Sequence, residues 1–283
     1  MTAPPQPIVS PQWLAQRLGD PDVVVADCRF DLADPEAGRR AYAAGHIPGA
    51  VYFDLEEDLS APAQRPGGRH PLPDVDELCR QLGQAGIGPG VTVVCYDDQQ
   101  GAMAARLWWM LRWLGHDAAA VLDGGFAGWR RAGLPVTDAP ANPTPRRFVP
   151  APRPELVASA EDVQRLVQEG RGVLVDSRAP ERYRGELEPI DPVAGHIPGA
   201  RNLPWMDNVD ADGRWRHPGE LARRFAGLVG EEPVVVYCGS GVTACANLLA
   251  MAYAGVPVQP RLYVGGWSDW CTRPGSPVAK VDT

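Results

Sequence analysis

The stretch YCGSGVT, at residues 237–243, places Cys238 after a valine-rich run and before a helical pattern. Gly239 and Gly241 allow the backbone to curl, so that successive N–H groups point inward and can hold an anion. The following helix adds the positive end of its dipole to the same place. A thiol in such a loop ionises readily, and the thiolate is the reactive form. We therefore predict that Cys238 is a nucleophile.

The chain has six cysteines: Cys28, Cys79, Cys95, Cys238, Cys245 and Cys271. Most of them are interpreted as small buried apolar residues. Two cysteines in a C-x-x-C arrangement do not occur, and Cys238 and Cys245 are too far apart in sequence for a zinc knuckle. Disulfides are not expected either, because they are rare in a reducing compartment. The sequence thus predicts neither a metal site nor a cofactor.

The charge and the apolar segments limit the possible partners. A formal net charge of −8 argues against nucleic acid or an anionic membrane as the main partner. The first residues, MTAPPQPIVSPQWLAQRL, have neither the basic region nor the apolar region of a secretion signal. The most apolar stretch, LWWMLRWLG, is short and contains Arg112. We expect a cytoplasmic protein with no membrane span.

The chain contains two copies of one pattern. GHIPGA occurs at 45–50 and again at 195–200. Three more matches follow the same order: VVVADCR (23–29) with GVLVDSR (172–178), VTVVCYD (91–97) with PVVVYC (233–238), and VLDGGFAGWRRAGLPV (121–136) with LYVGGWSDWCTRPGSPV (262–278). Such a repeat indicates a duplicated domain. We predict domains at 1–137 and 156–283, joined by a stiff proline-rich linker at 138–155.

Each copy alternates buried strand patterns with helical patterns. The expected strands are 22–27, 91–96, 118–123, 172–176 and 233–237, and the expected helices are 75–86, 101–115, 159–170, 220–230 and 244–255. This alternation predicts an α/β fold in which each domain has a mostly parallel sheet with helices on both faces. Active loops of such sheets follow the carboxyl ends of strands, where Cys238 lies. Asp97 takes the matching position in the first copy, so that copy is predicted to be inactive.

The duplicated pattern, GHIPGA in each half, CGSGVTA at 238–244 and GGW after the next strand resemble the two-domain rhodanese-type sulfurtransferases, particularly the 3-mercaptopyruvate branch. The resemblance implies that Cys238 takes a sulfane sulfur from a small anionic donor and becomes a persulfide. It then passes the sulfur to a thiol or a thioredoxin-like acceptor. The loop residues Gly239, Gly241, Val242 and Thr243 are expected to bind the donor.

Charge distinguishes between two donors. Thiosulfate is a dianion that leaves as sulfite, and it benefits from basic side chains after the cysteine. Here those positions hold the neutral residues Gly239 and Ser240. Mercaptopyruvate leaves as an enolate that must gain a proton, which requires a proton-handling group. We predict mercaptopyruvate as the donor, with thiosulfate as the alternative.

The resemblance also implies a relay that carries this proton. It would run from Ser240 to His70, in GRHPLP, and on to Glu56, in YFDLEED, across the domain interface. His46 and His196 lie inside GHIPGA in both copies, including the inactive one, so they are interpreted as structural.

An arginine is expected to bind the carboxylate of the donor. Arg182, in ERYRG, matches the position that has this role in the family, and a planar guanidinium suits a carboxylate. The mercaptopyruvate branch usually has a second arginine soon after, where this sequence has Ile190.

Two other classes of protein carry a cysteine loop of this kind. A phosphatase loop requires an arginine six positions after the cysteine, and Ala244 stands there. A non-catalytic persulfide carrier or binding module would use the same loop, and turnover with a donor and cyanide would distinguish it from an enzyme.

Overall fold

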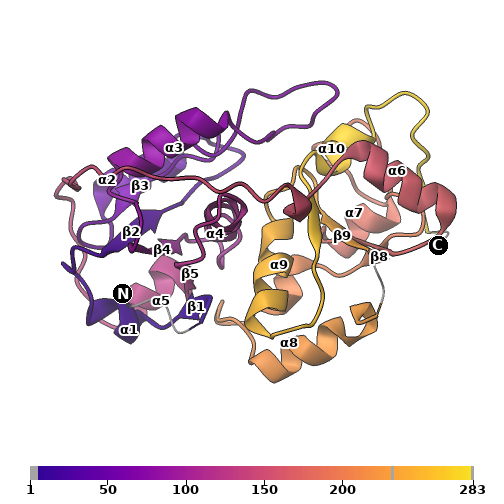
Figure 1. Cartoon of the computed structure of the whole chain (residues 1–283). Coiled ribbons are helices and arrows are strands. Elements are labelled where there is room, and N and C mark those ends of the chain that lie inside the picture. The colour runs from indigo at the N-terminus through magenta and orange to yellow at the C-terminus, as the bar shows by residue number, and fades with distance from the viewer. Residues whose placement is uncertain (1–5, 231–232, 282–283) are drawn as a thin grey trace. The chain divides into compact units, whose positions relative to one another are not determined.

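The computed structural model describes residues 6–230 and 233–281, which form two compact units (Figure 1). The first unit comprises Met1–Ala61, Pro73–Arg153 and Val209–Trp215, and the second comprises Pro62–Leu72, Pro154–Asn208 and Arg216–Thr283. The segment 62–72, which carries His70, thus belongs to the second unit although it comes from the first half of the sequence. Residues 1–5, at the start of the stretch MTAPPQPIVSPQWLAQRL, lie outside the described residues.

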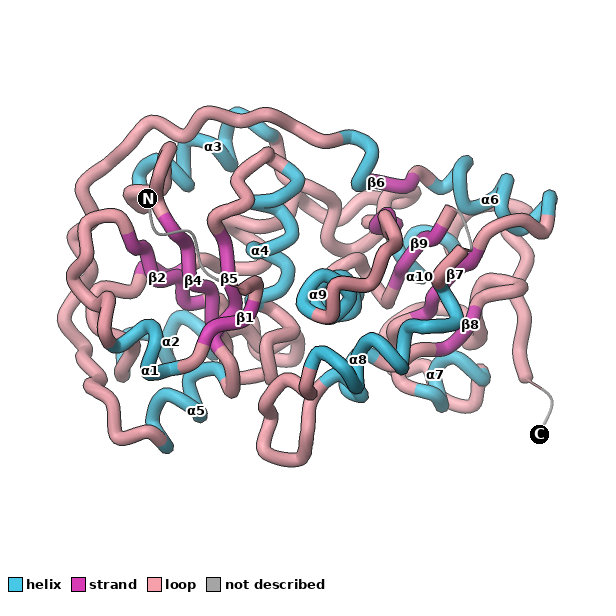
Figure 2. The backbone as a smooth tube through the Cα atoms, turned by 60° about the horizontal axis from the view of Figure 1, so that its bottom comes forward, coloured by secondary structure: helices cyan, strands magenta, loops and turns pink. Residues whose placement is uncertain are grey.

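The first unit is built on a five-stranded sheet with the order β1-β5-β4-β2-β3, and its strand pairs are parallel. The strands are β1 (Ile8–Val9), β2 (Val23–Asp27), β3 (Val51–Tyr52), β4 (Thr92–Tyr96) and β5 (Ala119–Leu122). The helices are α1 (Pro11–Ala15), α2 (Ala37–Ala44), α3 (Val75–Gln84), α4 (Ala104–Trp113) and α5 (Gly125–Arg131). Figure 2 shows α3 and α4 on one side of the sheet and α1, α2 and α5 on the other. Every residue of the central strand β4 is buried, because helices cover both faces.

The second unit repeats this arrangement. Its sheet has the order β6-β10-β9-β7-β8, again with parallel pairs. The strands are β6 (Val157–Ala158), β7 (Val173–Asp176), β8 (Arg201–Asn202), β9 (Val234–Tyr237) and β10 (Arg261–Tyr263). The α-helices are α6 (Ala160–Glu169), α7 (Pro180–Arg184), α8 (Pro218–Phe225), α9 (Ala244–Tyr253) and α10 (Gly266–Trp270), and the 3-10 helices are η1 (Pro154–Leu156), η2 (Trp205–Asn208) and η3 (Ala226–Leu228). The predicted α/β fold with two similar domains is therefore confirmed.

The strand register makes Asp97 and Cys238 equivalent. Each follows the last residue of the central strand of its sheet, β4 or β9. The carbonyl of Asp97 accepts the N–H of Phe126 at 2.8 Å, and the carbonyl of Cys238 accepts the N–H of Trp267 at 2.8 Å. The two units therefore place the carboxylate and the thiol at the same point of the fold.

Local sequence explains where the helices begin and end. Ser159 caps α6 with a capping box that includes Asp162. α4 ends two residues before Gly115, which has a φ of 84° that most residues avoid. α9 is apolar on all sides except at Asn247, and eight of its residues are buried, from Ala244 to Met251. It is therefore a core helix, which fixes the loop that precedes it.

The proline-rich segment contains no helix or strand between residues 138 and 153. Its backbone forms hydrogen bonds with helices and loops of the first unit. The Arg146 N–H donates to the Gly83 carbonyl, and the Ala151 N–H donates to the Leu114 carbonyl, each at 2.8 Å. No helix in the described part of the chain is long and apolar enough to cross a bilayer.

Candidate active site

The loop from Cys238 to Thr243 connects β9 with α9. The first turn of α10 holds it in place: the Cys238 carbonyl accepts the N–H of Trp267, and the Gly239 carbonyl accepts the N–H of Ser268, each at 2.8 Å. The Cys238 residue is 2% exposed. Backbone hydrogen bonds from α10 therefore hold Cys238, the candidate nucleophile, in place.

The two glycines of the loop serve different purposes. Gly241 has a φ of 72°, and a Cβ there would lie 2.3 Å from the Val264 carbonyl oxygen, so no larger residue fits. Gly239 does not have a positive φ. A Cβ on Gly239 would instead lie 2.8 Å from Nη2 of Arg69 and 3.7 Å from the terminal nitrogens of Arg182. The backbone freedom expected of both glycines is thus needed at Gly241, whereas Gly239 makes room for two guanidinium groups.

The remaining loop residues complete the connection to the helix. Val242 is buried, while Thr243, the N-cap residue of α9, is half-buried. Thr243 makes no side-chain capping bond.

His70 and Ser240 are in contact in the second unit. Nδ1 of His70 lies 2.7 Å from Oγ of Ser240, and both residues are buried. A hydrogen bond at this distance can pass a proton in either direction, depending on which ring nitrogen carries it. His70 and Ser240, both expected to handle a proton, are thus in contact, and Ser240 lies two residues after Cys238 in the sequence.

The segment 62–72 reaches this loop because it is bonded to α10. The N–H of Gly67 donates to Oδ1 of Asp269 at 2.7 Å, and the N–H of Arg69 donates to Oγ of Ser268 at 3.1 Å. Gly68 lies against α10, where a Cβ would be 2.6 Å from the Gly265 carbonyl oxygen. α10 therefore positions both the Cys238 loop and the backbone beside His70.

Glu56, the third expected member of the relay, lies in the first unit. Its side chain is exposed, and its N–H donates to Oδ1 of Asp54 at 2.8 Å. A link from Glu56 to His70 remains a prediction.

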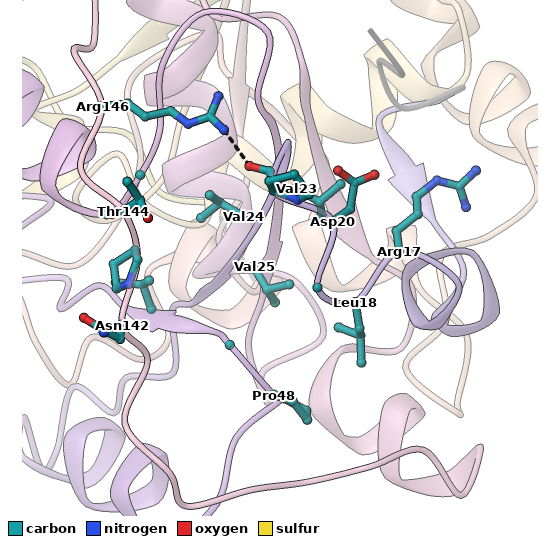
Figure 3. Close-up of a pocket in the computed structure, with 17 residues that line it drawn as sticks. Arg17, Leu18, Asp20, Val23, Val24, Val25, Pro48, Asn142, Thr144 and Arg146 are labelled. Atoms are coloured by element: carbon teal, nitrogen blue, oxygen red, sulfur yellow. Dashed lines mark hydrogen bonds between the residues drawn. The ribbon is translucent and has the colours of Figure 1, made fainter.

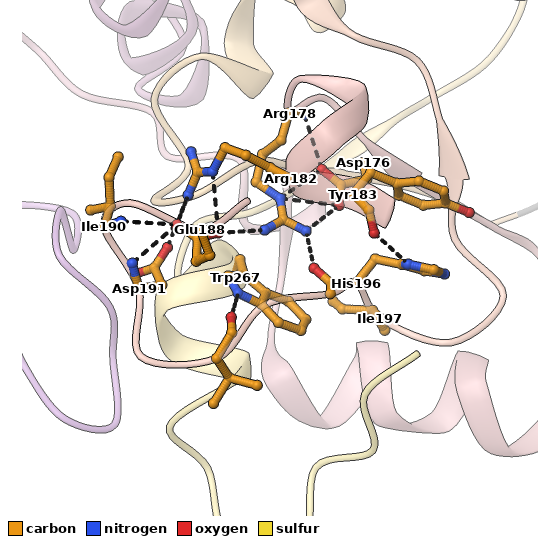
Figure 4. Close-up of polar contacts among 12 residues, drawn as sticks. Asp176, Arg178, Arg182, Tyr183, Glu188, Ile190, Asp191, His196, Ile197 and Trp267 are labelled. Carbon is orange, nitrogen blue, oxygen red and sulfur yellow. Dashed lines mark hydrogen bonds and ion pairs between the residues drawn. The ribbon is translucent and has the colours of Figure 1, made fainter. Parts of the chain in front are cut away.

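Arg182 belongs to a network of ion pairs in the second unit (Figure 4). Its Nη2 lies 2.6 Å from Oε1 of Glu188 and 3.3 Å from Oδ2 of Asp191. Oδ1 of Asp191 also forms a short ion pair with Nη1 of Arg69. Arg182 and Arg69 therefore share one carboxylate beside Gly239.

Burial and the arginines act on the two acids of this network in opposite directions. Burial raises the pKa of Asp191 above its ordinary value, against the lowering effect of Arg69 and Arg182. Burial would also raise the pKa of Glu188, but the hydrogen bonds from Arg182 and from the backbone of Asp191 hold it below its ordinary value. Glu188 is thus the firmly ionised partner of Arg182.

Two neighbouring arginines are already engaged. Arg178 is buried and lies 2.6 Å from Oδ2 of Asp176 and 3.3 Å from Oε2 of Glu188. Burial would lower the pKa of Arg178, but the Asp176 carboxylate raises it. Arg184 pairs with Glu186 at 2.6 Å on the surface. Arg182 is paired as well, but its terminal nitrogens lie beside Gly239, next to Cys238, so it is the better candidate for binding an anionic donor.

The first unit fills the equivalent loop with its own carboxylate. Asp97 accepts the N–H groups of Gln99, Gly101, Met103 and Ala104 at 2.7–2.9 Å. Burial raises the pKa of Asp97, against the lowering effect of these bonds. The N–H groups of this turn in the first unit are thus bonded to a side chain of the turn itself.

The two GHIPGA histidines make matching contacts. Nδ1 of His46 lies 2.8 Å from the Tyr42 carbonyl oxygen, and Nδ1 of His196 lies 2.8 Å from that of Tyr183. Each imidazole also stacks on the same tyrosine, with ring centroids 4.0 and 3.8 Å apart. These contacts fit a structural role in both units.

The first unit has a pocket of about 450 Å³, shown in Figure 3. Valines, prolines and glycines form much of its lining, and Arg146 at its edge donates to the Pro21 carbonyl at 2.7 Å. None of the residues that line it was predicted to take part in the chemistry.

Sequence reasoning missed Arg69, Ser268 and Asp269. Two of these residues could have been found by comparing the two copies. Ser268 and Asp269 are polar, whereas the first copy has the small residues Ala127 and Gly128 at the same positions. Arg69 gave no signal of its own in an arginine-rich chain, because its place beside Gly239 depends on tertiary structure.

Comparison with known proteins gives consistent results. The model of the rhodanese-like domain matches residues 10–132 and 159–273. The chain is 49% identical over 280 residues to the "Probable 3-mercaptopyruvate sulfurtransferase" of Pseudomonas aeruginosa, covering 97% of this chain and 98% of that protein. It is 37% identical over 280 residues to the thiosulfate sulfurtransferase of Mus musculus, covering 94% and 92%. The crystal structure of SseA from Escherichia coli, one of the 3-mercaptopyruvate sulfotransferases with the rhodanese fold, is similar with a TM-score of 0.78 and 34% identity, covering 93% of this chain and 99% of that one.

Proposed function

The chain belongs to the family of two-domain sulfurtransferases built from rhodanese-like domains, and we propose that it transfers a sulfane sulfur from 3-mercaptopyruvate through a persulfide on Cys238. The contact of 2.7 Å between His70 and Ser240, in the loop headed by Cys238, carries this proposal. It supplies a proton path of the kind that an enolate leaving group needs and that sulfite does not.

In the first step, the Cys238 thiolate attacks the sulfur of the donor. A sulfur–sulfur bond forms and the carbon–sulfur bond of the donor breaks, and its electron pair stays on carbon as the pyruvate enolate. The enolate takes a proton from the Ser240 hydroxyl, which His70 reprotonates, and pyruvate leaves. Glu56 completes the relay in this proposal.

Arg182 holds the carboxylate of the donor during this step. Its guanidinium lies beside Gly239, directly after the nucleophile. In this proposal Gly241, Val242 and Thr243 also bind the donor, through a turn whose backbone N–H groups stabilise negative charge on the sulfur. Loss of the charge-assisted bond in Arg182→Ala is expected to raise KM for the donor about 10- to 100-fold. Arg184→Ala, which removes an exposed arginine of the same helix, serves as the control.

In the second step, an acceptor thiolate attacks the outer sulfur of the persulfide. A new sulfur–sulfur bond forms on the acceptor, and Cys238 regains its thiolate. The acceptor is a small thiol or a thioredoxin-like protein in this proposal. A cytoplasmic location fits the same chemistry, because all six cysteines are free thiols, as a reducing compartment keeps them.

The test is a comparison of kcat/KM for 3-mercaptopyruvate and thiosulfate with the same acceptor, cyanide. The proposal predicts a higher value for 3-mercaptopyruvate. A higher value for thiosulfate would assign the protein to the other donor. Persulfide formation without turnover would make it a sulfur carrier.

A further inference from the structure

We propose that Arg69 is a second carboxylate-binding residue of the donor site, acting together with Arg182. This inference rests on the proposed function and adds a residue that the motifs did not indicate. Arg69 comes from the segment 62–72, whereas Arg182 comes from α7.

The geometry places both guanidinium groups at the residue after the nucleophile. A Cβ on Gly239 would lie 2.8 Å from Nη2 of Arg69, closer than the 3.7 Å to the nitrogens of Arg182. A carboxylate has two oxygens with about four acceptor positions, so it can bind two guanidinium groups at once. A donor whose sulfur is next to Cys238 would have its carboxylate within reach of both.

Arg69 has an unused donor in this position. Its Nη1 pairs with Asp191, but its Nε is buried and has no hydrogen-bond partner among the described residues. A buried donor of a charged group is costly to leave unbonded. The side chain is 24% exposed, so a small ligand can approach it.

A purely structural role does not account for these features. The backbone of Arg69 already fixes the segment, since its N–H donates to Ser268. Asp191 already has a partner in Arg182. A guanidinium that served only to neutralise Asp191 would not need to lie against Gly239 with Nε unbonded.

The main test is the KM of Arg69→Ala for 3-mercaptopyruvate. We expect a rise of about 10- to 100-fold with kcat changed by less than about twofold, as for loss of a charge-assisted contact in the bound donor. Arg69→Lys keeps the charge but loses the planar fork, so it should lie between wild type and Arg69→Ala. The matched control is Arg65→Ala, an exposed arginine of the same segment, which should leave KM unchanged.

The double variant Arg69→Ala with Asp191→Asn separates donor binding from neutralisation of Asp191. If Arg69 binds the donor, KM stays raised in the double variant. A return to the wild-type KM would overturn the inference, and so would an unchanged KM in both Arg69→Ala and Arg69→Lys. A fall in kcat as large as that of His70→Ala would also overturn it, because Arg69 would then act through His70. In each of these cases the wild type still forms persulfide from 3-mercaptopyruvate, whereas failure of the proposed function would abolish that reaction itself.

Discussion

At the scale of single residues, the site consists of a thiol fixed by its backbone and side chains that approach from two segments. Cys238 is held through its backbone carbonyl, which constrains the position of the residue. Ser240 meets a histidine from residues 62–72, and Gly239 meets the guanidinium of Arg69 from the same segment. The site therefore requires that this segment be docked correctly.

The contact between His70 and Ser240 leads to a prediction about donor choice. Ser240→Ala and His70→Ala should each lower kcat for 3-mercaptopyruvate by about 10²-fold, as expected for loss of a general acid. They should affect thiosulfate much less, because sulfite needs no proton on carbon. The double variant should be little worse than either single variant, since residues that act as a unit are not additive. Steady-state kinetics with both donors would check this, and equal losses for the two donors would contradict the proton role.

The motif residues could be predicted from sequence, but their partners could not. Cys238, Ser240 and His70 stand in recognisable stretches, whereas Arg69 and Ser268 act through contacts between segments about 200 residues apart. Gly239 shows the same limit: its neighbours are side chains from two distant segments, so sequence alone suggested a backbone role.

At the scale of elements, α10 has the organising role. Its first turn accepts or donates four bonds, two to the Cys238 loop and two to the segment with His70. The small helix thus holds the Cys238 loop and the backbone beside His70 close to each other.

Ser268→Ala should weaken this positioning. Loss of the bond to the Arg69 N–H frees the backbone next to His70, and we expect kcat for 3-mercaptopyruvate to fall about 3- to 10-fold, a cost of about 1 kcal/mol. The fall in kcat should be larger with 3-mercaptopyruvate than with thiosulfate. Ser276→Ala, in the loop after α10, is the control. A loss shared equally by both donors would assign Ser268 a general structural role.

The turn at residues 188–191 leads to a prediction about pH. The folded-state pKa of Glu188 is lowered, because hydrogen bonds outweigh the effect of burial, so its ionised form stabilises the fold above its unfolded pKa. This contribution is lost as the pH falls through the folded pKa. Glu188→Gln should therefore reduce the free energy of unfolding by about 2 kcal/mol at pH 7, and the difference from wild type should shrink in acid. Chemical denaturation at several pH values would measure it, with Glu186→Gln as the exposed control. A difference that persisted unchanged in acid would contradict this origin.

The elements show where sequence patterns are sufficient. Buried strands such as β4 and β9 and long helices such as α3 and α9 lie within one or two residues of their predicted ranges. The two-residue edge strands were missed, because two residues hold no periodic signal. The five-residue helix α10 was missed for the same reason.

At the scale of the whole molecule, the two units share one backbone arrangement but have different side chains after the central strand, Asp97 in one and Cys238 in the other. Gln100 has a φ of 61°, close to the 72° of Gly241 at the matching position, so the first unit retains the turn without the glycine. The carboxylate of Asp97 now occupies the centre of that turn. The sequence alone shows that Asp97 stands at the position of Cys238, while the internal bonds of Asp97 required the structure.

The first unit should not regain activity from a thiol alone. Asp97→Cys in a Cys238→Ser background is expected to give no sulfur transfer, because Gln99 stands where the second unit has Ser240. Cyanide turnover with either donor would test this, with Cys238→Ser alone as the baseline. Turnover above that baseline would show that the first unit still contains a working site.

Mass spectrometry of the protein after exposure to 3-mercaptopyruvate tests the central proposal most directly. The account predicts one added sulfur on the peptide that contains Cys238, removed again by a thiol acceptor. Cys245 lies only seven residues later, so separate peptides or fragment ions must distinguish the two thiols. The Cys245 thiol donates a hydrogen bond to the Gly241 carbonyl. Cys238→Ser should show no added sulfur and no turnover. Sulfur on Cys245, or full turnover in Cys238→Ser, would contradict the account.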